Sequence, residues 1–487
     1  MIDPVQLSIF LLVTVLIGVL TWLQIKGKTD DDRASGKDYF LAGRSLSWYF
    51  VAGSITLTNL STDQLVGMNG NQMALLAWWE LAAVAGLMIL AFVFVPIYYR
   101  NQCTTTTELL ERKYGDRNIR ALISVLFLLG NLFIYLPLML YSGSLFLKSL
   151  SGTELPILVI AVGFAVVGTG YAVYGGLRAV AVSDTISGVL VLGLALYVVY
   201  AALKAIGFDL SAIPSERLTL IGDAQSPIPF PTLFTGMILI QIFYWSTNQT
   251  ITQRAMAAPT IREAQKGVVA AAGIRLLIVP AIVVLPGIAA FELFGDVGDE
   301  AYGRVTGMVL PGWLSGVFAA AIAAAVLTSF NSVLNSSATL FVMDLYRPYR
   351  GELQNVARTS NIVSITMAVV GILFVPLYQQ ADSLINLVQQ LNGLLSMPIL
   401  SAFAVGLLFR NVAAGAAMTG VVLGVAFYAF VSFVWEPFHY IHAMALVFAF
   451  SVAVSLLTNR LVFGRDASFV LGGDKVRAAL SYPSSRP

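Results

Sequence analysis

The feature that most limits the fold of this chain is a series of thirteen apolar stretches, each about 20 residues long or longer. A helix of about 20 apolar residues crosses the hydrocarbon core of a lipid bilayer. Within that core a segment must satisfy its own backbone N–H and C=O groups, which favours helices. Only 11% of the 487 residues are charged, against about 25% in soluble proteins. We therefore expect an all-α membrane protein with about 13 transmembrane helices.

The predicted spans are numbered 0 to 12 in chain order. Their approximate limits are 5–25, 46–69, 74–99, 119–147, 155–174, 182–205, 231–253, 268–293, 307–342, 359–378, 383–409, 412–434 and 439–458. The remaining segment, 459–487, is polar and is predicted to be a solvated tail.

Basic residues gather on one side of these spans. Of the 28 Lys and Arg residues, 23 lie in alternate loops or in the tail, four lie in the loops on the other side, and Arg275 lies inside a span. Cytoplasmic loops of membrane proteins carry such an excess of positive charge. We therefore expect a multi-pass protein of the cell (inner) membrane, with its N-terminus outside and its C-terminus in the cytoplasm.

Two spans are too polar to face lipid along their whole length. Span 1 contains a nearly continuous polar run from Thr58 to Gln64, and span 6 contains another from Gln241 to Arg254. The two spans lie five apart and run in opposite directions, as expected of an inverted repeat whose two first helices are broken at the midplane. A broken helix offers free carbonyls to a cation and free N–H groups to a solute. The alternative explanation is polar contact between packed helices.

Span 8 and four charged residues add further polar groups. Span 8 carries hydroxyl and amide side chains between Thr328 and Ser337. Their oxygens suit a hard cation such as sodium, although Ser and Thr also bond to helix carbonyls. Charged side chains inside spans are costly and mark functional positions; here they are Asp63, Glu80, Asp184 and Arg275. Glu80 and Arg275 either bind one hydroxylated ligand together or pair with each other.

Several short motifs in these spans resemble those of the sodium/solute symporter family, and most closely its bacterial sodium/galactose (sodium/glucose-type) members. The matching pieces are Asn59–Met68, Tyr174–Leu177, Tyr244–Trp245 with Asn248–Gln249, Gln253–Ala258 with Glu263–Gly267, Val284–Ala290, and Leu334–Thr339 with Met343–Asp344. They occur in the family's order from span 1 to span 8.

The resemblance implies an inverted-repeat (5+5) sodium-coupled transporter fold, with helices 1 and 6 of the repeat broken. It divides the chain into an extra N-terminal helix and cytoplasmic loop, a first repeat, an extracellular loop, a second repeat, two C-terminal helices and a cytoplasmic tail. The corresponding ranges are 1–45, 46–205, 206–230, 231–410, 411–458 and 459–487.

The resemblance also implies where sodium binds. The family's conserved site lies between spans 1 and 8, and its ligands here are the carbonyls of Leu57, Leu60 and Ala325 with the hydroxyls of Thr328 and Ser329. Some members have a second sodium site, which corresponds to Asp184, Thr328, Asn331 and Ser332. Asn331 stands where those members have Ser, so the number of sodium ions per cycle stays open between one and two, with one favoured.

The sugar site of the family is matched by residues from several spans. The substrate-binding positions are Gln64, Glu80, Gln241, Tyr244, Arg275 and Gln389, and the gate positions are Met68, Trp79 and Ile385 on the outer side and Tyr244 on the inner side. Gln241 replaces the relative's Asn, and Arg275 replaces its Lys. A planar guanidinium does not reproduce the geometry of an ammonium group, so the specificity is open to change.

These observations predict a symporter that imports a sugar or polyol with sodium by alternating access. A monomer is expected to suffice for transport, and no nucleic acid is expected as a partner. The alternative solutes are an amino acid such as proline, whose two charges Glu80 and Arg275 would neutralise, and then myo-inositol or sialic acid. Sialic acid is disfavoured because no Lys or Arg occurs between Arg120 and Lys148, where sialic-acid members have an Arg in span 3.

Two other classes of membrane protein fit the sequence less well. An enzyme would need a metal cluster, a nucleophile–base pair or a phosphate loop, and none is recognisable among these residues, which include one Cys and two His. The chain is therefore predicted not to be an enzyme. A sodium channel or sensor would need a continuous polar pore instead of two broken helices with aromatic gates.

Overall fold

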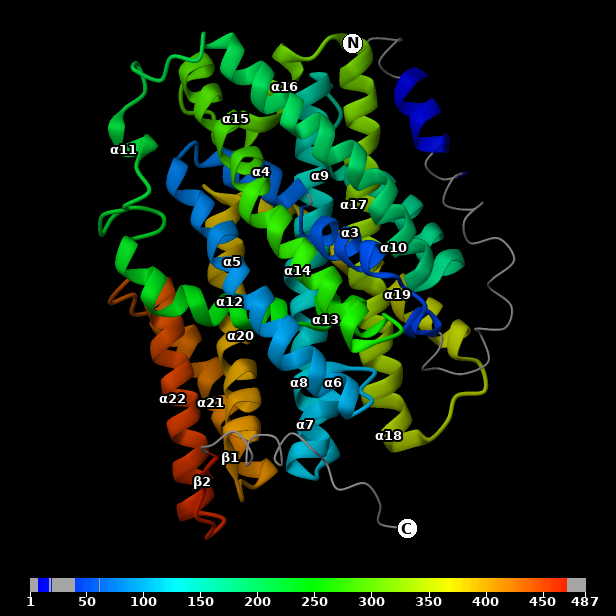
Figure 1. Cartoon of the computed structure of the whole chain (residues 1–487), viewed down its shortest axis with the longest axis vertical. Coiled ribbons are helices and arrows are strands. Elements are labelled where there is room, and N and C mark those ends of the chain that lie inside the picture. Colours follow the sequence, from blue (N-terminus) through cyan, green and yellow to red (C-terminus); the bar gives the residue numbers. More distant parts are fainter. Residues whose placement is uncertain (1–7, 17–18, 20–39, 61, 471–487) are drawn as a thin grey trace.

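The computed structural model describes residues 8–16, 19, 40–60 and 62–470, without the side chains of residues 57, 58 and 173–186 (Figure 1). Almost all of this part of the chain is helical. Five helical segments belong to the predicted spans 1 and 2 and one precedes them: η1 (Ala42–Arg44), α3 (Trp48–Asn59), α4 (Thr62–Gly70), η2 (Ala74–Ala77), α5 (Trp78–Ile89), and the π-helical η3 (Leu90–Phe94), which continues into α6 (Val95–Arg100).

The rest of the first predicted repeat and the loop after it follow. They comprise α7 (Thr106–Tyr114), α8 (Arg117–Gly130), the π-helical η4 (Asn131–Tyr135), α9 (Leu136–Ser151), α10 (Ile157–Ala205), α11 (Ser215–Leu218) and η5 (Phe230–Phe234).

The second predicted repeat and the C-terminal helices complete the described chain. They comprise α12 (Gly236–Ser246), α13 (Gln249–Met256), α14 (Ile261–Leu277), α15 (Val279–Phe294), η6 (Gly298–Glu300), α16 (Ala301–Val309), α17 (Gly312–Leu340), the π-helical η7 (Phe341–Tyr346), α18 (Arg347–Arg350), α19 (Val356–Tyr378), α20 (Leu384–Leu408), β1 (Phe409–Arg410), α21 (Ala414–Phe433), α22 (Tyr440–Leu461) and β2 (Ser468–Phe469).

Among the described residues, nine helical stretches are long and apolar enough to cross a membrane. They coincide with the predicted spans 2, 3, 5 and 7 to 12. The predicted spans 1 and 6 are each divided into two shorter helices, and span 4 forms the first part of α10. Span 0 falls largely outside the described residues, of which 8–16 are helical.

The two predicted helix breaks are confirmed. In the first repeat α3 ends at Asn59, Leu60 leaves the helical conformation with φ −81° and ψ 62°, and α4 begins at Thr62. In the second repeat α12 ends at Ser246 and α13 begins at Gln249. The side chain of Asn248 accepts a hydrogen bond from the N–H of Thr250 at 2.9 Å, which is a standard way to start a helix.

Three π-helical turns each come directly before a helix with proline at its second position. These prolines are Pro96, Pro137 and Pro348. Proline lacks an N–H, and its ring collides with the carbonyl four residues earlier. A wider π turn moves that carbonyl aside without ending the helix. In span 3 the carbonyl of Phe133, four residues before Pro137, accepts a hydrogen bond from the hydroxyl of Tyr378 at 2.9 Å.

One predicted boundary is not seen in the structure. The sequence suggested separate spans at 155–174 and 182–205, whereas α10 runs without interruption from Ile157 to Ala205. No proline occurs in this range, and a glycine inside a helix costs only about 1 kcal/mol. Gly175 and Gly176 therefore do not suffice to end the helix.

The helices form three groups that pack on each other. The first group contains α3, α5, α12 and α14, and is named the core bundle below; the second contains α9, α10, α17 and α19, and is named the scaffold. The third contains α20, α21 and α22, which lie beside α12 (Figure 1). Helix α17 is almost wholly buried, because its alanines from Ala319 to Ala325 allow neighbouring helices to approach closely.

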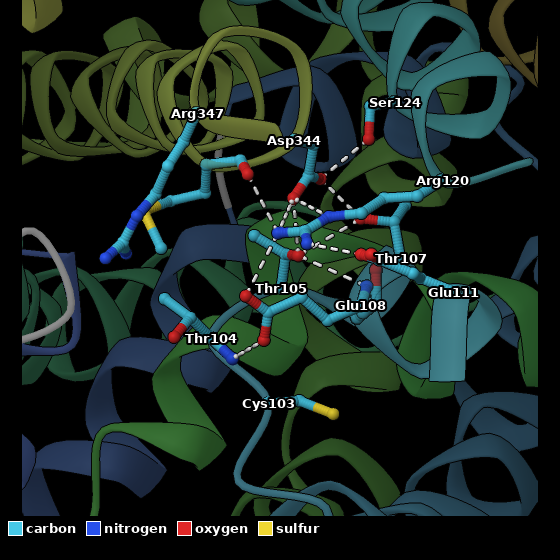
Figure 2. Close-up of polar contacts among 12 residues, drawn as sticks. Cys103, Thr104, Thr105, Thr107, Glu108, Glu111, Arg120, Ser124, Asp344 and Arg347 are labelled. Atoms are coloured by element: carbon cyan, nitrogen blue, oxygen red, sulfur yellow. Dashed lines mark hydrogen bonds and ion pairs between the residues drawn. The ribbon is translucent and has the colours of Figure 1, made fainter. Parts of the chain in front are cut away.

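A polar cluster joins α7, α8 and η7 at one end of the molecule (Figure 2). The carboxylate of Asp344, which is fully buried, accepts hydrogen bonds from Ser124 at 2.6 Å, Thr105 at 2.8 Å and the Nε of Arg120 at 2.7 Å. Arg120 also pairs with Glu108 at 3.0 Å and with Glu111 at 2.6 Å. The cluster therefore holds the amphipathic α7 against two scaffold-side helices, with most of its charges compensated.

We name this end of the molecule the basic end. It is the lower end in Figure 1, where α7, α18 and β1 are labelled, and it carries Arg112, Arg117, Arg347, Arg350 and Arg410. The opposite end carries α11 and α16 (Figure 1).

Candidate functional site

A small cavity lies beside both helix breaks. Its free volume is about 50 Å³, and it is lined by Asn59, Asp63, Gln64, Met68, Trp79, Tyr135, Leu138, Ile240, Gln241, Tyr244, Trp245, Ile385, Val388, Gln389 and Asn392. Seven of the predicted substrate and gate residues are among them. Such a volume holds a few water molecules, whereas pockets for small organic ligands measure about 300 Å³ or more. The surrounding helices therefore have to move apart before a solute fits.

Glu80 and Arg275 pair with each other behind the wall of this cavity. Both side chains are fully buried, neither lines the cavity, and the guanidinium of Arg275 contacts the Glu80 carboxylate. Gln64 donates to the other Glu80 oxygen at 2.6 Å. The guanidinium also lies over the ring of Trp245, 4.5 Å from its centroid, which adds a cation–π contact. Of the two roles that the sequence left open, the structure shows the direct ion pair.

Asn59 connects this ion pair to Tyr244. The hydrogen-bond network favours the amide orientation in which the Asn59 oxygen accepts from Gln64 at 3.0 Å and from Arg275 at 2.5 and 3.0 Å. The Asn59 nitrogen then donates to the hydroxyl of Tyr244 at 2.5 Å. The last residue of α3 thus joins the buried charges to the aromatic ring on the cavity wall.

Gln241 ties α12 to the start of α5. Its amide nitrogen donates to the carbonyl of Trp79 at 2.8 Å, and its oxygen accepts from the indole of Trp245 at 2.9 Å. The two helices approach so closely that a Cβ at Gly86 would lie 2.3 Å from the Gln241 carbonyl oxygen. Both ends of the Gln241 amide are therefore engaged within the core bundle.

The cavity is closed toward both ends of the molecule. At the basic end Gln249 accepts from the N–H of Thr106 at 2.9 Å, and Gln253 donates to Thr339 at 3.1 Å. At the opposite end Asn71 donates to the hydroxyl of Ser383 at 3.1 Å. These contacts join α13 to α17 and the α4 end to the start of α20, so a path to either side requires some of them to break.

Asp299 belongs to the contact at the opposite end. It lies in η6, outside the candidate membrane spans. Its carboxylate accepts from the N–H of Leu384 at 2.9 Å, and a Cβ at Gly70 would lie 2.3 Å from it. Burial raises the pKa of the Asp299 carboxyl to about 7, against which the hydrogen bond from Leu384 acts.

This raised pKa predicts that the stability of the protein falls as the pH rises. The folded packing keeps a proton that an unfolded chain, with a pKa near 4, releases earlier. The contribution is therefore fully present below about pH 4 and is lost as the pH rises through about 7. We expect the melting temperature of the purified protein to fall between pH 5 and pH 8, and the fall to be smaller in Asp299→Asn. Asp382→Asn, which changes an exposed carboxyl at the same end, should follow wild type. Equal pH profiles for wild type and Asp299→Asn would contradict the assignment.

The residues that the resemblance assigns to sodium lie on two helices in contact. Helix α17 packs against α3 and α4, and its residues Thr328 and Ser329 are buried. The hydroxyl of Thr328 donates to the carbonyl of Ala325 at 3.1 Å, which leaves the lone pairs of the hydroxyl oxygen for a cation. Leu60 lies at the break after α3, and Leu57 lies within α3, with its side chain outside the described residues.

The residues of the second sodium site are only partly brought together. The side chain of Asp184 lies outside the described residues. Ser332 donates to the carbonyl of Thr328 at 2.7 Å and accepts a hydrogen bond from the guanidinium of Arg254. Both polar atoms of the buried Asn331 amide lack a hydrogen-bond partner. The second site therefore remains a prediction.

Four polar residues on the cavity wall were not among the predicted site residues. They are Asn59, Asp63, Tyr135 and Asn392. Asn59 and Asp63 belong to the polar run of span 1, and that run was a usable signal. Tyr135 carries no such signal, because it is one aromatic residue in an apolar span. It reaches the cavity from the π turn η4, whose first residue Asn131 donates to Ser337 at 2.9 Å.

Comparison with known proteins gives a consistent result. The model of the "Sodium:solute symporter family" matches residues 39–424. Two relatives match most of the chain. The "Uncharacterized symporter YidK" of Escherichia coli (strain K12) is 36% identical over 93% of this chain and 83% of its own length. The sodium/glucose cotransporter of Vibrio parahaemolyticus is 32% identical over 92% of this chain and 88% of its own length.

A solved structure shares the fold. The substrate-bound outward-open state of a Na⁺-coupled sialic acid symporter superposes with a TM-score of 0.80 at 17% identity, covering 94% of this chain and 98% of that chain. At this level of identity the likeness shows the fold alone, which is that of a sodium-coupled transporter.

Proposed function

Because the chain belongs to the sodium:solute symporter family, we propose that it imports a neutral sugar or polyol together with sodium. The observation that carries this proposal is the composition of the cavity wall. The wall offers amides, a phenol and aromatic rings, and it includes no Lys, Arg or His. A sugar presents several hydroxyls and one apolar face, and amides with an aromatic ring match both.

The absence of a cation on the cavity wall argues against a solute with a carboxylate. The side chain of Arg275, inside a predicted span, is fully buried and pairs with Glu80. An amino acid or an acidic sugar would have to break that pair to gain a counter-charge, and removing one partner of a buried pair costs about 3–5 kcal/mol. The 32% identical relative, a sodium/glucose cotransporter, supports the same choice.

Six residues are proposed to contact the solute or to hold those that do. Gln64, Gln389 and Tyr244 line the cavity directly. Gln241 lines it too, but its amide is engaged by Trp79 and Trp245. Glu80 and Arg275 act from behind the wall by holding Gln64 and Asn59. Met68, Trp79 and Ile385 form the outer lid in this proposal, and Tyr244 closes the inner side.

Sodium is proposed to drive the cycle from the break between α3 and α4. An ion bound by the carbonyls of Leu57, Leu60 and Ala325 with the hydroxyls of Thr328 and Ser329 joins the core bundle to the scaffold. A ligand shifts such an equilibrium only by its different affinity for the two states. One positive charge that moves inward gains about 2.3 kcal/mol per 100 mV, and a tenfold sodium gradient adds about 1.4 kcal/mol.

The proposed orientation places the basic end in the cytoplasm, because cytoplasmic loops carry the excess of Lys and Arg. Outward opening then requires the contact of Asn71 with Ser383 to break, and inward opening requires the contacts of Gln249 and Gln253 to break. The core bundle moves against the scaffold between these states, and a monomer holds every residue that the proposal uses.

The test is uptake of radiolabelled galactose and glucose into proteoliposomes, with and without an inward sodium gradient. We expect sodium-dependent accumulation of at least one sugar by wild type, and its loss in Gln64→Ala, where the partner of Glu80 is also lost. Gln389→Ala should lower uptake at low sugar concentration about fivefold, the effect of one neutral hydrogen bond worth about 1 kcal/mol.

The matched control is Gln390→Ala on the same helix. Gln390 donates to the carbonyl of Ser432 at 2.6 Å and does not line the cavity, so its replacement should leave the apparent sugar affinity unchanged. Sodium-dependent uptake of proline without uptake of sugars would overturn the proposed solute and leave the family assignment intact.

A further inference from the structure

A second cavity, separate from the one above, lies at the basic end. Its free volume is about 300 Å³, and its lining includes Lys113, Tyr114, Leu407, Arg410, Asn411 and Val470. These residues come from the end of α7, the end of α20, the loop before α21 and the chain just after β2 (Figure 1). No residue of the proposed solute or sodium sites belongs to it.

The charges on the wall of this cavity are all positive. Its lining contains Lys113 and Arg410 and no carboxylate. Burial lowers the pKa of Lys113, and the neighbouring charge of Arg410 lowers it further. Within the described part of the chain no carboxylate pairs with Arg410, since the nearby Glu111 pairs with Arg120. Two repelling cations at one cavity create a potential that an anion would relieve.

The walls of the cavity are held in place by the fold. Strand β1 pairs with β2 so that Arg410 lies opposite Ser468, and the N–H of Val470 donates to the carbonyl of Leu408 at 2.8 Å. Asn459 of α22 donates to the carbonyl of Asn411 at 3.0 Å. The hydroxyl of Tyr114 donates to the carbonyl of Ala402 at 2.8 Å. The cavity is therefore enclosed by hydrogen-bonded segments and is not a gap between loose loops.

Apolar side chains surround the elements that form the cavity. The rings of Phe409 and Phe469 lie 5.2 Å apart across the two strands, and Phe469 is 51% exposed. Leu461 and Val462, at the end of α22, are also exposed. This end of α22 is where the last candidate span ends, so the exposed apolar surface lies at the depth where lipid acyl chains meet their head groups.

We propose that this cavity binds the phosphate head group of an anionic phospholipid, with its acyl chains against the apolar surface around Phe469. Cationic pockets at the ends of membrane helices bind such head groups because the phosphate meets fixed positive charge. Inorganic phosphate offers the same charge without acyl chains, and the adjacent apolar surface favours the lipid. The inference does not depend on which solute the protein carries.

The test measures binding of acyl-labelled phosphatidylglycerol to the purified full chain in a non-ionic detergent by fluorescence anisotropy. The double variant Lys113→Gln/Arg410→Gln should bind at least tenfold more weakly than wild type. The control Arg350→Gln/Arg358→Gln removes two exposed charges from the same end and changes the net charge equally, so it should bind like wild type. Unlabelled phosphatidylcholine should compete poorly with the labelled lipid.

Two outcomes would overturn the proposal. Equal weakening in both double variants would mean that only the net charge of the basic end matters. Displacement of the labelled lipid by millimolar inorganic phosphate as effectively as by unlabelled phosphatidylglycerol would assign the cavity to a free anion. The melting temperature of each variant, measured in phosphatidylcholine micelles, separates a folding defect from a loss of binding.

Discussion

The Arg275→Met variant should have a free energy of unfolding about 3–5 kcal/mol below that of wild type. The side chains of Arg275 and Glu80 are both fully buried and in contact. Methionine removes the positive charge and leaves the Glu80 carboxylate in the interior with Gln64 as its remaining donor, at 2.6 Å. The penalty comes from the desolvated charge and not from lost volume, because methionine fills much of the space of the arginine stem.

Two variants isolate this cause. Glu80→Gln/Arg275→Met removes both charges and should recover much of the lost stability, since replacing a whole buried pair is often close to neutral. Arg304→Met breaks the pair of Arg304 with Glu300, which is nearly half exposed, and should cost about 0–1 kcal/mol. Unfolding of the purified protein, followed by denaturant titration in detergent, gives the three differences. A loss for Arg275→Met no larger than that for Arg304→Met would show that the charge is hydrated.

The breaks in α3–α4 and α12–α13 could be predicted because polarity inside a membrane span has few explanations. A run such as Thr58 to Gln64 cannot face lipid, so it must lie at a cavity or at a break. The same reasoning located Asn248, a residue type that starts helices. In each case the sequence signal and the structural cause involve the same few neighbouring residues.

The continuity of α10 could not be predicted, because two glycines in an apolar stretch are compatible with either a turn or a helix. The pairing of Glu80 with Arg275 was equally open. The two residues are 195 positions apart, and their types fit both a shared ligand and a direct pair. The choice between these depends on the distance between α5 and α14, which is set by packing and by Gly86, and not by either charged residue.

Tyr135 shows a third kind of limit. Its position on the cavity wall depends on the π turn before Pro137, which changes the direction of the following side chains by an extra residue in the turn. A regular helical projection of span 3 would have placed this ring on a different face. Proline within a predicted span is therefore a sequence signal that the periodicity of the span should not be trusted beyond it.

Replacing Thr328 with valine should raise the sodium concentration for half-maximal uptake tenfold or more. The substitution keeps the branched shape and removes one of the five proposed oxygen ligands. An interaction with a charged group contributes about 1.5–3 kcal/mol, and 1.4 kcal/mol corresponds to a factor of ten. Because the Thr328 hydroxyl proton is directed at the carbonyl of Ala325, the oxygen presents its lone pairs away from the helix, as ion binding requires.

Three further variants make this prediction specific to the ion. Ser329→Ala removes a second proposed ligand and should weaken sodium binding in the same direction, whereas Thr328→Ser keeps the hydroxyl and should retain wild-type sodium dependence. Thr366→Val changes an exposed threonine of α19 that bonds only to the carbonyl of Ile362, and it should have no effect. Sodium titration of uptake at saturating sugar measures all four variants. Unchanged sodium dependence in Thr328→Val would remove this hydroxyl from the ion site and move the coupling ion to another part of the chain.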